Sequence, residues 1–284
     1  MSFFRYPGGK SKLRSKIVSK LNDMAGDLDL EYREPFFGGG SIGLQYLEKS
    51  KNNKVWINDL DLGIYCLWMS VFRYPEKLKE NVLKFTPSVD AFYSFKNDLT
   101  RDCKLIDVDT IVDFGFKKLA IHQISYSGLG TKSGGPLGGQ SQASDYKIDC
   151  RWSPKYICKK IDKLNTQFKK YSLRFSGMDF SDVILEDTKD AIIYLDPPYF
   201  IKGNDLYQHG FNDEDHIRLA NCLKNTKHKW LLSYDDCDEI RELYSWANIE
   251  ELNGVSYSIT ALKDKESGKR TSRQKTELLI SAGY

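Results

Sequence analysis

The spacing of apolar residues predicts helices and strands in alternation at both ends of the chain. Apolar positions at Leu13, Ile17 and Leu21 recur every four residues and predict a helix over 11–22. Short apolar runs predict buried strands at 31–37, 54–58, 173–175, 191–195 and 230–234, and helical spacing predicts helices over 41–49, 60–71 and 213–223. Two further strands, 256–260 and 277–281, are predicted to pair antiparallel. This alternation is typical of an α/β protein with a largely parallel sheet.

The stretch 62–170 interrupts this alternation and is predicted to be an insertion. Helical spacing dominates 74–122, and a basic amphipathic helix is predicted over 154–170. The glycine-rich segment 127–145 between them has little apolar surface, which suits either a ligand-reading loop or an exposed linker. We therefore predict one domain formed by 1–61 and 171–284, and a second, mostly helical domain formed by 62–170.

Composition limits the possible functions only a little. The 284 residues are 40% hydrophobic, which is enough for a sizeable core, and their net charge is +3. Basic residues gather in 1–22, 155–174 and 263–275, which together suit a polyanion, although each segment alone is typical of a solvated surface. The cysteines and histidines lack metal-ligand spacing, and no apolar run has the length of a signal peptide or membrane span. We expect a cytoplasmic protein that uses no metal and has no membrane partner.

The strand predicted at 191–195 ends in the most specific motif of the chain, Asp196-Pro197-Pro198-Tyr199. Ligands of open α/β sheets bind at the carboxyl ends of strands. The two prolines remove two N–H donors, so this turn offers a carboxylate and a backbone carbonyl beside an aromatic ring. That combination suits a flat substrate with an amino group. The alternative is a turn that only ends the strand, because paired prolines do so in many proteins.

A second motif predicts a turn that binds a nucleoside. The run Pro35-Phe36-Phe37-Gly38-Gly39-Gly40-Ser41 joins a predicted strand to a predicted helix, and the next strand ends at Asp59. Glycine lets a nucleoside pass close to the backbone, and a carboxylate at Asp59 can accept both ribose hydroxyls. The same pattern serves dehydrogenases that bind NAD. The run Pro7-Gly8-Gly9-Lys10-Ser11 is not a P-loop, because Phe4 occupies the position of the first glycine.

Taken in order, these motifs resemble those of the GATC-type DNA adenine N6-methyltransferase family, which uses S-adenosylmethionine (AdoMet). The resemblance covers nearly the whole chain and is carried by Tyr6-Pro7-Gly8-Gly9-Lys10, the glycine turn, Asn58-Asp59, Asp196-Pro197-Pro198-Tyr199 and Glu277-Leu278-Leu279. It implies an α/β fold, with a Rossmann-like AdoMet-dependent methyltransferase sheet and an inserted, mostly helical DNA-recognition domain. The run Gln123-Ile124-Ser125-Tyr126-Ser127-Gly128 departs from the family, whose members often have an arginine there.

The resemblance also implies roles for individual residues. Asp196, Pro197, Pro198 and Tyr199 would be catalytic, with the Asp196 carboxylate and the Pro197 carbonyl holding the amino group of an extruded adenine that stacks on Tyr199. The AdoMet site would contain Tyr6, Pro7, Gly8, Lys10, Phe37, Gly38, Gly40, Asp59, Asp179, Phe180 and Asp196. Contacts to DNA would come from Lys10, Gln123, Ser125, Tyr126, Lys132, Gln140 and Arg270.

The implied function is site-specific methylation of adenine N6 in double-stranded DNA, with a cognate restriction endonuclease as a second partner that such a system can include. Two alternatives stay open. One is an RNA amino-group methyltransferase, a class that shares the Asp-Pro-Pro-Tyr motif but usually lacks a large insertion. The other is a DNA-binding homologue that has lost catalysis, against which the intact Asp59, Asp196 and Tyr199 argue.

Overall fold

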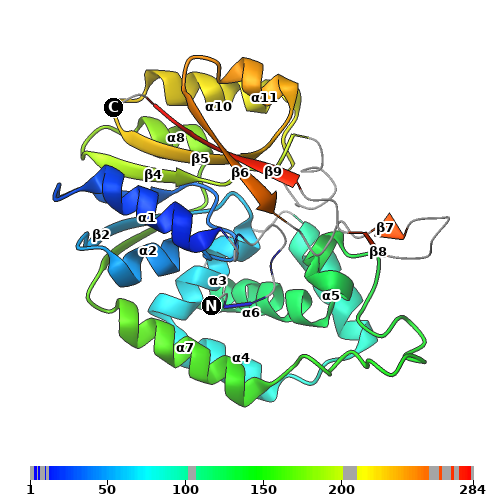
Figure 1. Ribbon diagram of the computed structural model, residues 1–284. Coiled ribbons are helices and arrows are strands. Elements are labelled where there is room, and N and C mark those ends of the chain that lie inside the picture. Colours follow the sequence, from blue (N-terminus) through cyan, green and yellow to red (C-terminus); the bar gives the residue numbers. More distant parts are fainter. Residues whose placement is uncertain are drawn as a thin grey trace.

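A seven-stranded sheet forms the centre of the computed structural model (Figure 1), which describes residues 3, 4, 6, 10, 13–101, 107–200, 210–255, 262–263, 270–271 and 275–282. In sheet order the strands are β3 (Ser172–Ser176), β2 (Lys54–Asn58), β1 (Glu31–Glu34), β4 (Ala191–Leu195), β5 (Lys229–Asp235), β9 (Lys275–Ser281) and β6 (Asn248–Val255). Neighbouring strands from β3 to β5 are parallel, whereas β9 runs antiparallel to both β5 and β6. The strand order reverses between β1 and β4, and in open α/β sheets such a reversal marks the ligand-binding crevice.

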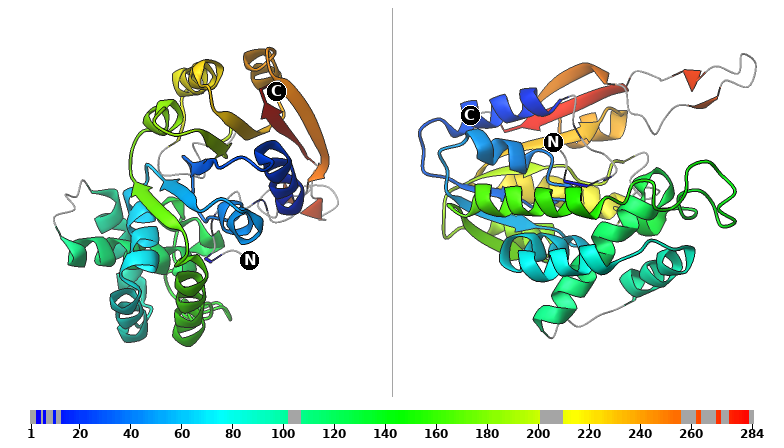
Figure 2. Two further views of the ribbon diagram at one scale, coloured as in Figure 1. Left: turned by 90° about the vertical axis from the view of Figure 1, so that its left-hand side faces the viewer. Right: turned by 90° about the horizontal axis from the view of Figure 1, so that it is seen from below.

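Helices cover both faces of the sheet, as Figure 2 shows. On β4, Ile192 and Tyr194 join one hydrophobic cluster, while Ile193 and Leu195 join another, as the two-residue period of a strand requires. The first cluster includes residues of α1 (Arg14–Ala25), α2 (Gly43–Lys49) and α3 (Leu62–Arg73). The second includes residues of α8 (Phe180–Leu185), α10 (Asp213–Asn225) and α11 (Asp238–Leu243). The strand β4 is therefore buried on both faces.

The predicted insertion, 62–170, is mostly helical and begins with α3. After α3 it contains α4 (Pro75–Lys84), α5 (Val89–Thr100), α6 (Val108–Ile124) and α7 (Pro154–Phe168), with two short 3₁₀ turns after α6. Helices α3 and α6 approach closely at Gly115, where a Cβ atom would lie 2.6 Å from the Cys66 carbonyl oxygen. Leu119 of α6 and Tyr194 of β4 belong to the same hydrophobic cluster. The division into domains 1–61 with 171–284 and 62–170 stays a prediction.

The predicted α/β fold is confirmed, and the sequence analysis missed the position of one strand. The partner of β9 on its outer side is β6, Asn248–Val255, whereas the predicted partner 256–260 lies outside the described residues. β6 is an edge strand with the polar run Glu250-Glu251 at its centre, so its apolar pattern is weak. None of the described helices is long and apolar enough to cross a membrane.

Candidate functional site

The predicted motifs meet at the carboxyl edge of the parallel strands. The glycine turn follows β1, Asp59 follows β2, Asp179 follows β3 by three residues, and Asp196 follows β4. Since β1 lies between β2 and β4, the turn stands between the two carboxylates that end those strands. Segments distant in sequence thus share one edge of the sheet (Figure 1).

Asp59 holds the glycine turn in place. Its Oδ2 accepts a hydrogen bond from the Gly38 N–H at 2.8 Å, and its Oδ1 accepts one from the Asp61 N–H at 2.9 Å. Gly38 and Gly40 have φ angles of 47° and 64°, a region in which other residues are strained. A Cβ atom at Gly38 would lie 2.6 Å from the ring of Tyr6. Only glycine at position 38 permits both this backbone conformation and this close approach.

The Asp59 carboxylate has an unusual affinity for protons. Burial, helped by the nearby charge of Asp61, raises its pKa to about 7, while the Gly38 N–H acts in the opposite direction. This group therefore changes its charge in the neutral range of pH.

Asn58 joins the loops that follow three neighbouring strands. Its side-chain amide donates to the carbonyl oxygens of Pro35 and Met178, both at 3.0 Å. Its Oδ1 accepts from Ser176 Oγ at 2.6 Å and from the Met178 N–H at 2.9 Å. The side chain is 1% exposed with all of its polar groups paired, so it fixes the loops after β1 and β3 relative to Asp59.

The catalytic motif surrounds a buried lysine. Lys10 Nζ lies 2.9 Å from Asp196 Oδ1 and 2.7 Å from Glu277 Oε1, with its side chain fully buried. It also stands 4.3 Å from the centroid of the Tyr199 ring, and the Tyr199 hydroxyl donates to Glu277 Oε1 at 2.6 Å. Ser233 Oγ donates to Asp196 Oδ1 at 3.2 Å. Asp196 and Tyr199 are thus held in one ionic network.

Opposing influences act on the Asp196 carboxylate. Burial raises its pKa, the Lys10 ammonium lowers it, and the charge of Glu277 raises it, with a net shift upward. Pro197 and Pro198 are buried, and the Phe200 N–H donates to Asp235 Oδ1 at 3.1 Å. The backbone directly after Tyr199 is therefore also fixed, by this hydrogen bond to β5.

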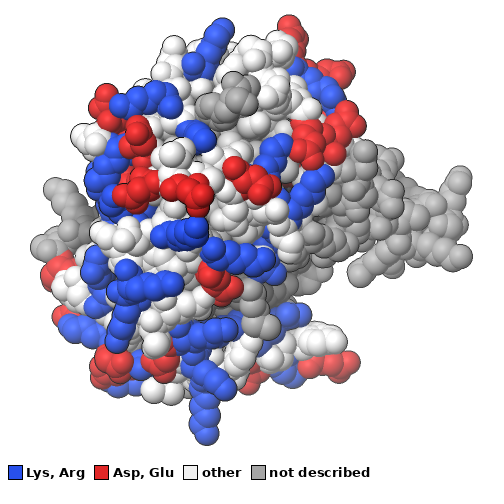
Figure 3. Space-filling view, turned by 60° about the vertical axis from the view of Figure 1, so that its left-hand side comes forward, with Lys and Arg blue, Asp and Glu red and all other residues white. Residues whose placement is uncertain are grey.

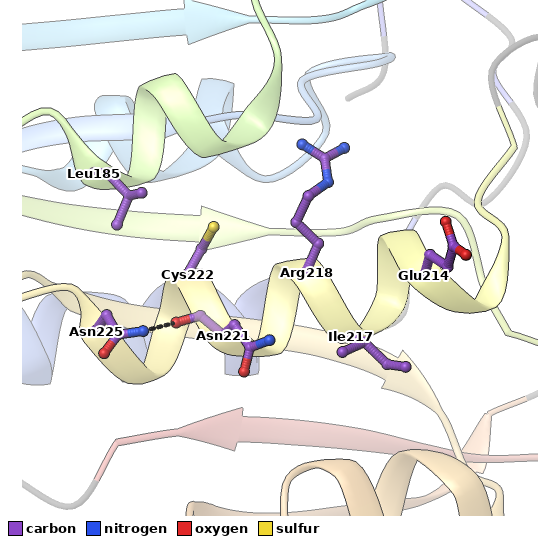
Figure 4. A pocket seen from close by; sticks show the side chains of 7 residues that line it. All are labelled: Leu185, Glu214, Ile217, Arg218, Asn221, Cys222 and Asn225. Atoms are coloured by element: carbon purple, nitrogen blue, oxygen red, sulfur yellow. Dashed lines mark hydrogen bonds between the residues drawn. The ribbon is translucent and has the colours of Figure 1, made fainter.

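Asp179 and Phe180 meet an arginine that the sequence analysis did not single out. Arg218 of α10 binds Asp179 through two hydrogen bonds, Nη1 to Oδ1 at 2.6 Å and Nη2 to Oδ2 at 3.0 Å, and its Cζ lies 4.3 Å from the Phe180 ring centroid. Burial would raise the pKa of Asp179, but hydrogen bonds from Arg218 and Ser181 hold it below its usual value. Arg218 also borders a pocket of about 340 Å³ that is lined by residues of α10 and by Leu185 of α8 (Figure 4). An amino group that reaches Asp179 must share this carboxylate with Arg218.

The predicted DNA-contacting residues differ widely in exposure. Tyr126 is 64% exposed, Lys132 and Gln140 are exposed, and Gln123 is half-buried. Ser125 is fully buried, and its Oγ accepts from the Gly130 N–H at 3.0 Å, so it shapes the start of the glycine-rich loop. The predicted DNA contact Arg270 is the first residue of the short strand β8 (Arg270–Thr271). Two of the predicted cofactor-binding residues, Pro7 and Gly8, lie outside the described residues.

The glycine-rich segment folds into ordered turns. Gln142 donates through Nε2 to the Leu137 carbonyl at 2.8 Å, and its Oε1 accepts from the Ile148 N–H at 2.7 Å. Ser127 and Gln142 both adopt positive φ angles, of 56° and 51°. The described part of this segment is therefore a structured loop that closes on itself.

Charges at the opposite, amino edge of the sheet are mixed. Figure 3 shows basic and acidic side chains side by side on this face of the molecule. Lys51 pairs with Asp27 at 2.8 Å, and Lys54 pairs with Asp29 at 2.6 Å. Among the residues that the structure describes, no group of three or more His, Cys, Asp or Glu side chains is arranged to hold a metal ion.

Comparisons with known proteins agree with this geometry. Residues 6–256 match the model of the family described as D12 class N6 adenine-specific DNA methyltransferase. Over 99% of this chain and 95% of the relative, the sequence is 23% identical to the Type II methyltransferase M1.LlaDCHI of Lactococcus lactis subsp. cremoris. It is also 23% identical to the Type II methyltransferase M.MjaIII of Methanocaldococcus jannaschii, over 88% of this chain and 90% of the relative. A shorter match, 42% identical over 22% of this chain and 25% of the relative, is to the Type II methyltransferase M.CviBI of Paramecium bursaria Chlorella virus NC1A.

Proposed function

The chain belongs to the D12 class N6 adenine-specific DNA methyltransferases, and we propose that it uses AdoMet to methylate an adenine turned out of duplex DNA at the carboxyl edge of its sheet. The observation that supports this site best is the position of Asp196-Pro197-Pro198-Tyr199 at the end of β4, beside the glycine turn after β1. The relatives bear Type II names, so a cognate restriction endonuclease is the partner we propose for this enzyme.

The residues at this edge fit AdoMet. The absence of a Cβ atom at Gly38 lets the Tyr6 ring lie directly against the glycine turn, and the Asp59 carboxylate follows the next strand, where it can accept ribose hydroxyls. When bound, AdoMet supplies a methyl group made electrophilic by its sulfonium sulfur. Tyr6, Pro7, Gly8 and Lys10 would hold the methionine end of AdoMet, and Asp196 would also bind its amino group. Phe37, Gly38 and Gly40 would line the site beneath the cofactor, and Asp179 and Phe180 would bind its adenine.

The chemical task of the catalytic motif is to activate a weak nucleophile. The lone pair of an adenine amino group is delocalised into the ring. Hydrogen bonds from its two protons to the Asp196 carboxylate and the Pro197 carbonyl would favour a pyramidal nitrogen with a localised lone pair, the form of the amino group that can act as a nucleophile. The positive charge that develops on nitrogen is stabilised by Asp196, and one N6 proton leaves after transfer.

Binding of the target base requires its extrusion from the duplex. Extrusion costs a few kcal/mol, and stacking on the exposed part of Tyr199 returns about 1–3 kcal/mol. Basic side chains on α7 and in the sequence segment 263–275 would hold backbone phosphates, which gives affinity without sequence information.

Expression in a host without DNA methylation tests the proposed function. Single-molecule sequencing of the host genome is expected to show N6-methyladenine at one recurrent sequence. In parallel, tritiated AdoMet is incubated with the purified protein and either duplex DNA or ribosomal RNA. Label in RNA alone, or in neither polymer, would overturn the proposal.

The raised pKa of Asp59 predicts that AdoMet binding depends on pH. Ribose hydroxyls donate best to an ionised carboxylate, and Asp59 gains a proton as the pH falls through about 7. We therefore expect the dissociation constant of AdoMet, measured by calorimetry, to be about tenfold higher at pH 6 than at pH 8. The matched variant Asp59→Asn is expected to bind more weakly at pH 8 and to lack this pH dependence. An equally steep dependence in Asp59→Asn would exclude Asp59 as its source.

A further inference from the structure

We propose that Glu277 is a positioning residue for methyl transfer, which holds the Lys10 ammonium and the Tyr199 hydroxyl so that Asp196 is free to accept the target amino group. This inference rests on the catalytic role proposed for Asp196. The sequence analysis gave Glu277 no role beyond its place in the terminal Glu-Leu-Leu run.

Glu277 is suited to act as a fixed anion. It is 1% exposed and lies within β9, where it pairs in register with Asp235 on β5 and with Leu252 on β6. Neighbouring strands on both sides leave its backbone little freedom to move. Its Oε1 receives both Lys10 Nζ, at 2.7 Å, and the Tyr199 hydroxyl, at 2.6 Å. One carboxylate oxygen therefore sets the positions of two groups in the catalytic network.

The Lys10 ammonium contacts the two side chains, Asp196 and Tyr199, that we expect the target adenine to contact. Its Nζ is 2.9 Å from Asp196 Oδ1 and 4.3 Å from the Tyr199 ring centroid. An adenine that donates its amino protons to Asp196 while stacking on Tyr199 needs much the same surroundings. The ammonium and the amino group therefore compete for the Asp196 carboxylate.

The outcome of this competition depends on the second anion. A buried ammonium that has only one carboxylate partner is strongly held by it, because withdrawal leaves both charges buried and unpaired. Glu277 removes that penalty, since Lys10 can turn away from Asp196 and remain paired. The entering base then displaces a shared cation and does not have to break an isolated ion pair.

The same arrangement affects how Asp196 titrates. The Lys10 charge lowers the pKa of Asp196 and the Glu277 charge raises it, with burial as the largest influence. Other titratable groups face Asp196 from the strands around it, namely Glu34 of β1, Tyr194 of β4 and Tyr234 of β5. Removing only the charge of Glu277 removes one of the two anions that the described residues place beside Lys10 and Asp196, which shifts the Asp196 pKa downward.

The test compares wild type with Glu277→Gln, a near-isosteric change that removes the charge. With duplex DNA from a methylation-free host and saturating AdoMet, we expect kcat to fall about 10–100-fold, less than the 10²–10⁴-fold typical of a lost acid–base group, because Glu277 acts through Lys10 and Tyr199. The acidic limb of the kcat profile is expected to move to lower pH, which a loss of folded protein would not cause. The control Glu251→Gln, on the neighbouring strand β6 with a side chain 48% exposed, should match wild type.

A second comparison removes the cation. In a Lys10→Met background the Lys10 ammonium no longer competes for Asp196, so Glu277 has no cation to draw away from it. Glu277→Gln should then cause no further loss of kcat. The double variant also replaces a buried ion pair by neutral groups, which commonly preserves folding even if Glu277→Gln alone does not fold. An equal loss from Glu277→Gln in both backgrounds, or wild-type kcat and pH profile in Glu277→Gln, would overturn the inference. If wild type itself transfers no methyl group, the proposed function fails instead.

Discussion

Asp196→Ala is expected to reduce methyl transfer to duplex DNA by about 10²–10⁴-fold, the range typical of a lost general acid–base group. The reason is chemical, because Asp196 is the carboxylate that would accept the target amino protons and stabilise the charge formed on nitrogen. Folding should survive the change. The side chain of Asp196 is 20% exposed, and Lys10 keeps its second partner, Glu277, at 2.7 Å. Single-turnover assays with tritiated AdoMet, in which the label transferred to DNA is counted on filters, measure the effect on the transfer step itself.

A surface carboxylate provides the control for this experiment. Asp187 lies between α8 and β4 with a side chain 78% exposed, so Asp187→Ala should retain wild-type transfer. Circular dichroism and the thermal midpoint establish that Asp196→Ala is folded. A folded Asp196→Ala enzyme with wild-type single-turnover rates would remove Asp196 from the mechanism.

The positions of the two carboxylates at strand ends were predictable from local sequence. A buried strand is an apolar run, and the first polar residue after it stands at the edge of the sheet, so Asp59 and Asp196 are marked by their neighbours. That both motifs lie on one edge follows from the rule for parallel sheets. These steps need only residues that are close in sequence or connected by a general rule of topology.

The partners of these carboxylates were not predictable in this way. The resemblance implies a cofactor contact for Lys10, and the structure adds that its ammonium bridges Asp196 and Glu277, both distant from it in sequence. Arg218 resembles any solvated charge on an amphipathic helix, yet it binds Asp179 with two hydrogen bonds. Such contacts depend on how α10 and β9 pack against the sheet, and a single sequence does not encode that packing in any local pattern.

The recognition segment shows the same limit on a smaller scale. Ser125 is a predicted DNA contact because it lies in the run 123–128, where the family has its recognition region, and in the structure its hydroxyl is buried and accepts from the Gly130 N–H. Ser127 has a positive φ of 56°, and this conformation is not predictable from a serine in the sequence, because residues other than glycine adopt it rarely. The DNA contacts of this segment stay predictions, while its shape depends on hydrogen bonds between side chains and backbone, such as those of Gln142.

Arg33→Met is expected to lower the free energy of unfolding by about 3–5 kcal/mol, because it leaves one partner of a buried ion pair uncompensated. Arg33 lies on β1, directly before the loop of the glycine turn, and is 0% exposed. Its Nε donates to Glu31 Oε2 at 2.9 Å and its Nη2 to Glu186 Oε2 at 2.6 Å. Nη1 also donates to the Val183 carbonyl at 3.0 Å, so this one side chain joins β1 to α8 and to the loop before β4.

Urea unfolding followed by circular dichroism measures this effect, with Arg101→Met at an exposed position as the control that should change stability by less than about 0.5 kcal/mol. The proposed cause makes a further prediction. Glu31 is 3% exposed, so in Arg33→Met its carboxylate keeps only the 3.4 Å contact with Lys189 Nζ, whose side chain is 55% exposed, and the added change Glu31→Gln should recover part of the lost stability. If Glu31→Gln instead adds a second, independent loss, the destabilisation comes from lost packing around Trp56, whose ring lies 5.3 Å from Arg33 Cζ, and not from unpaired charge.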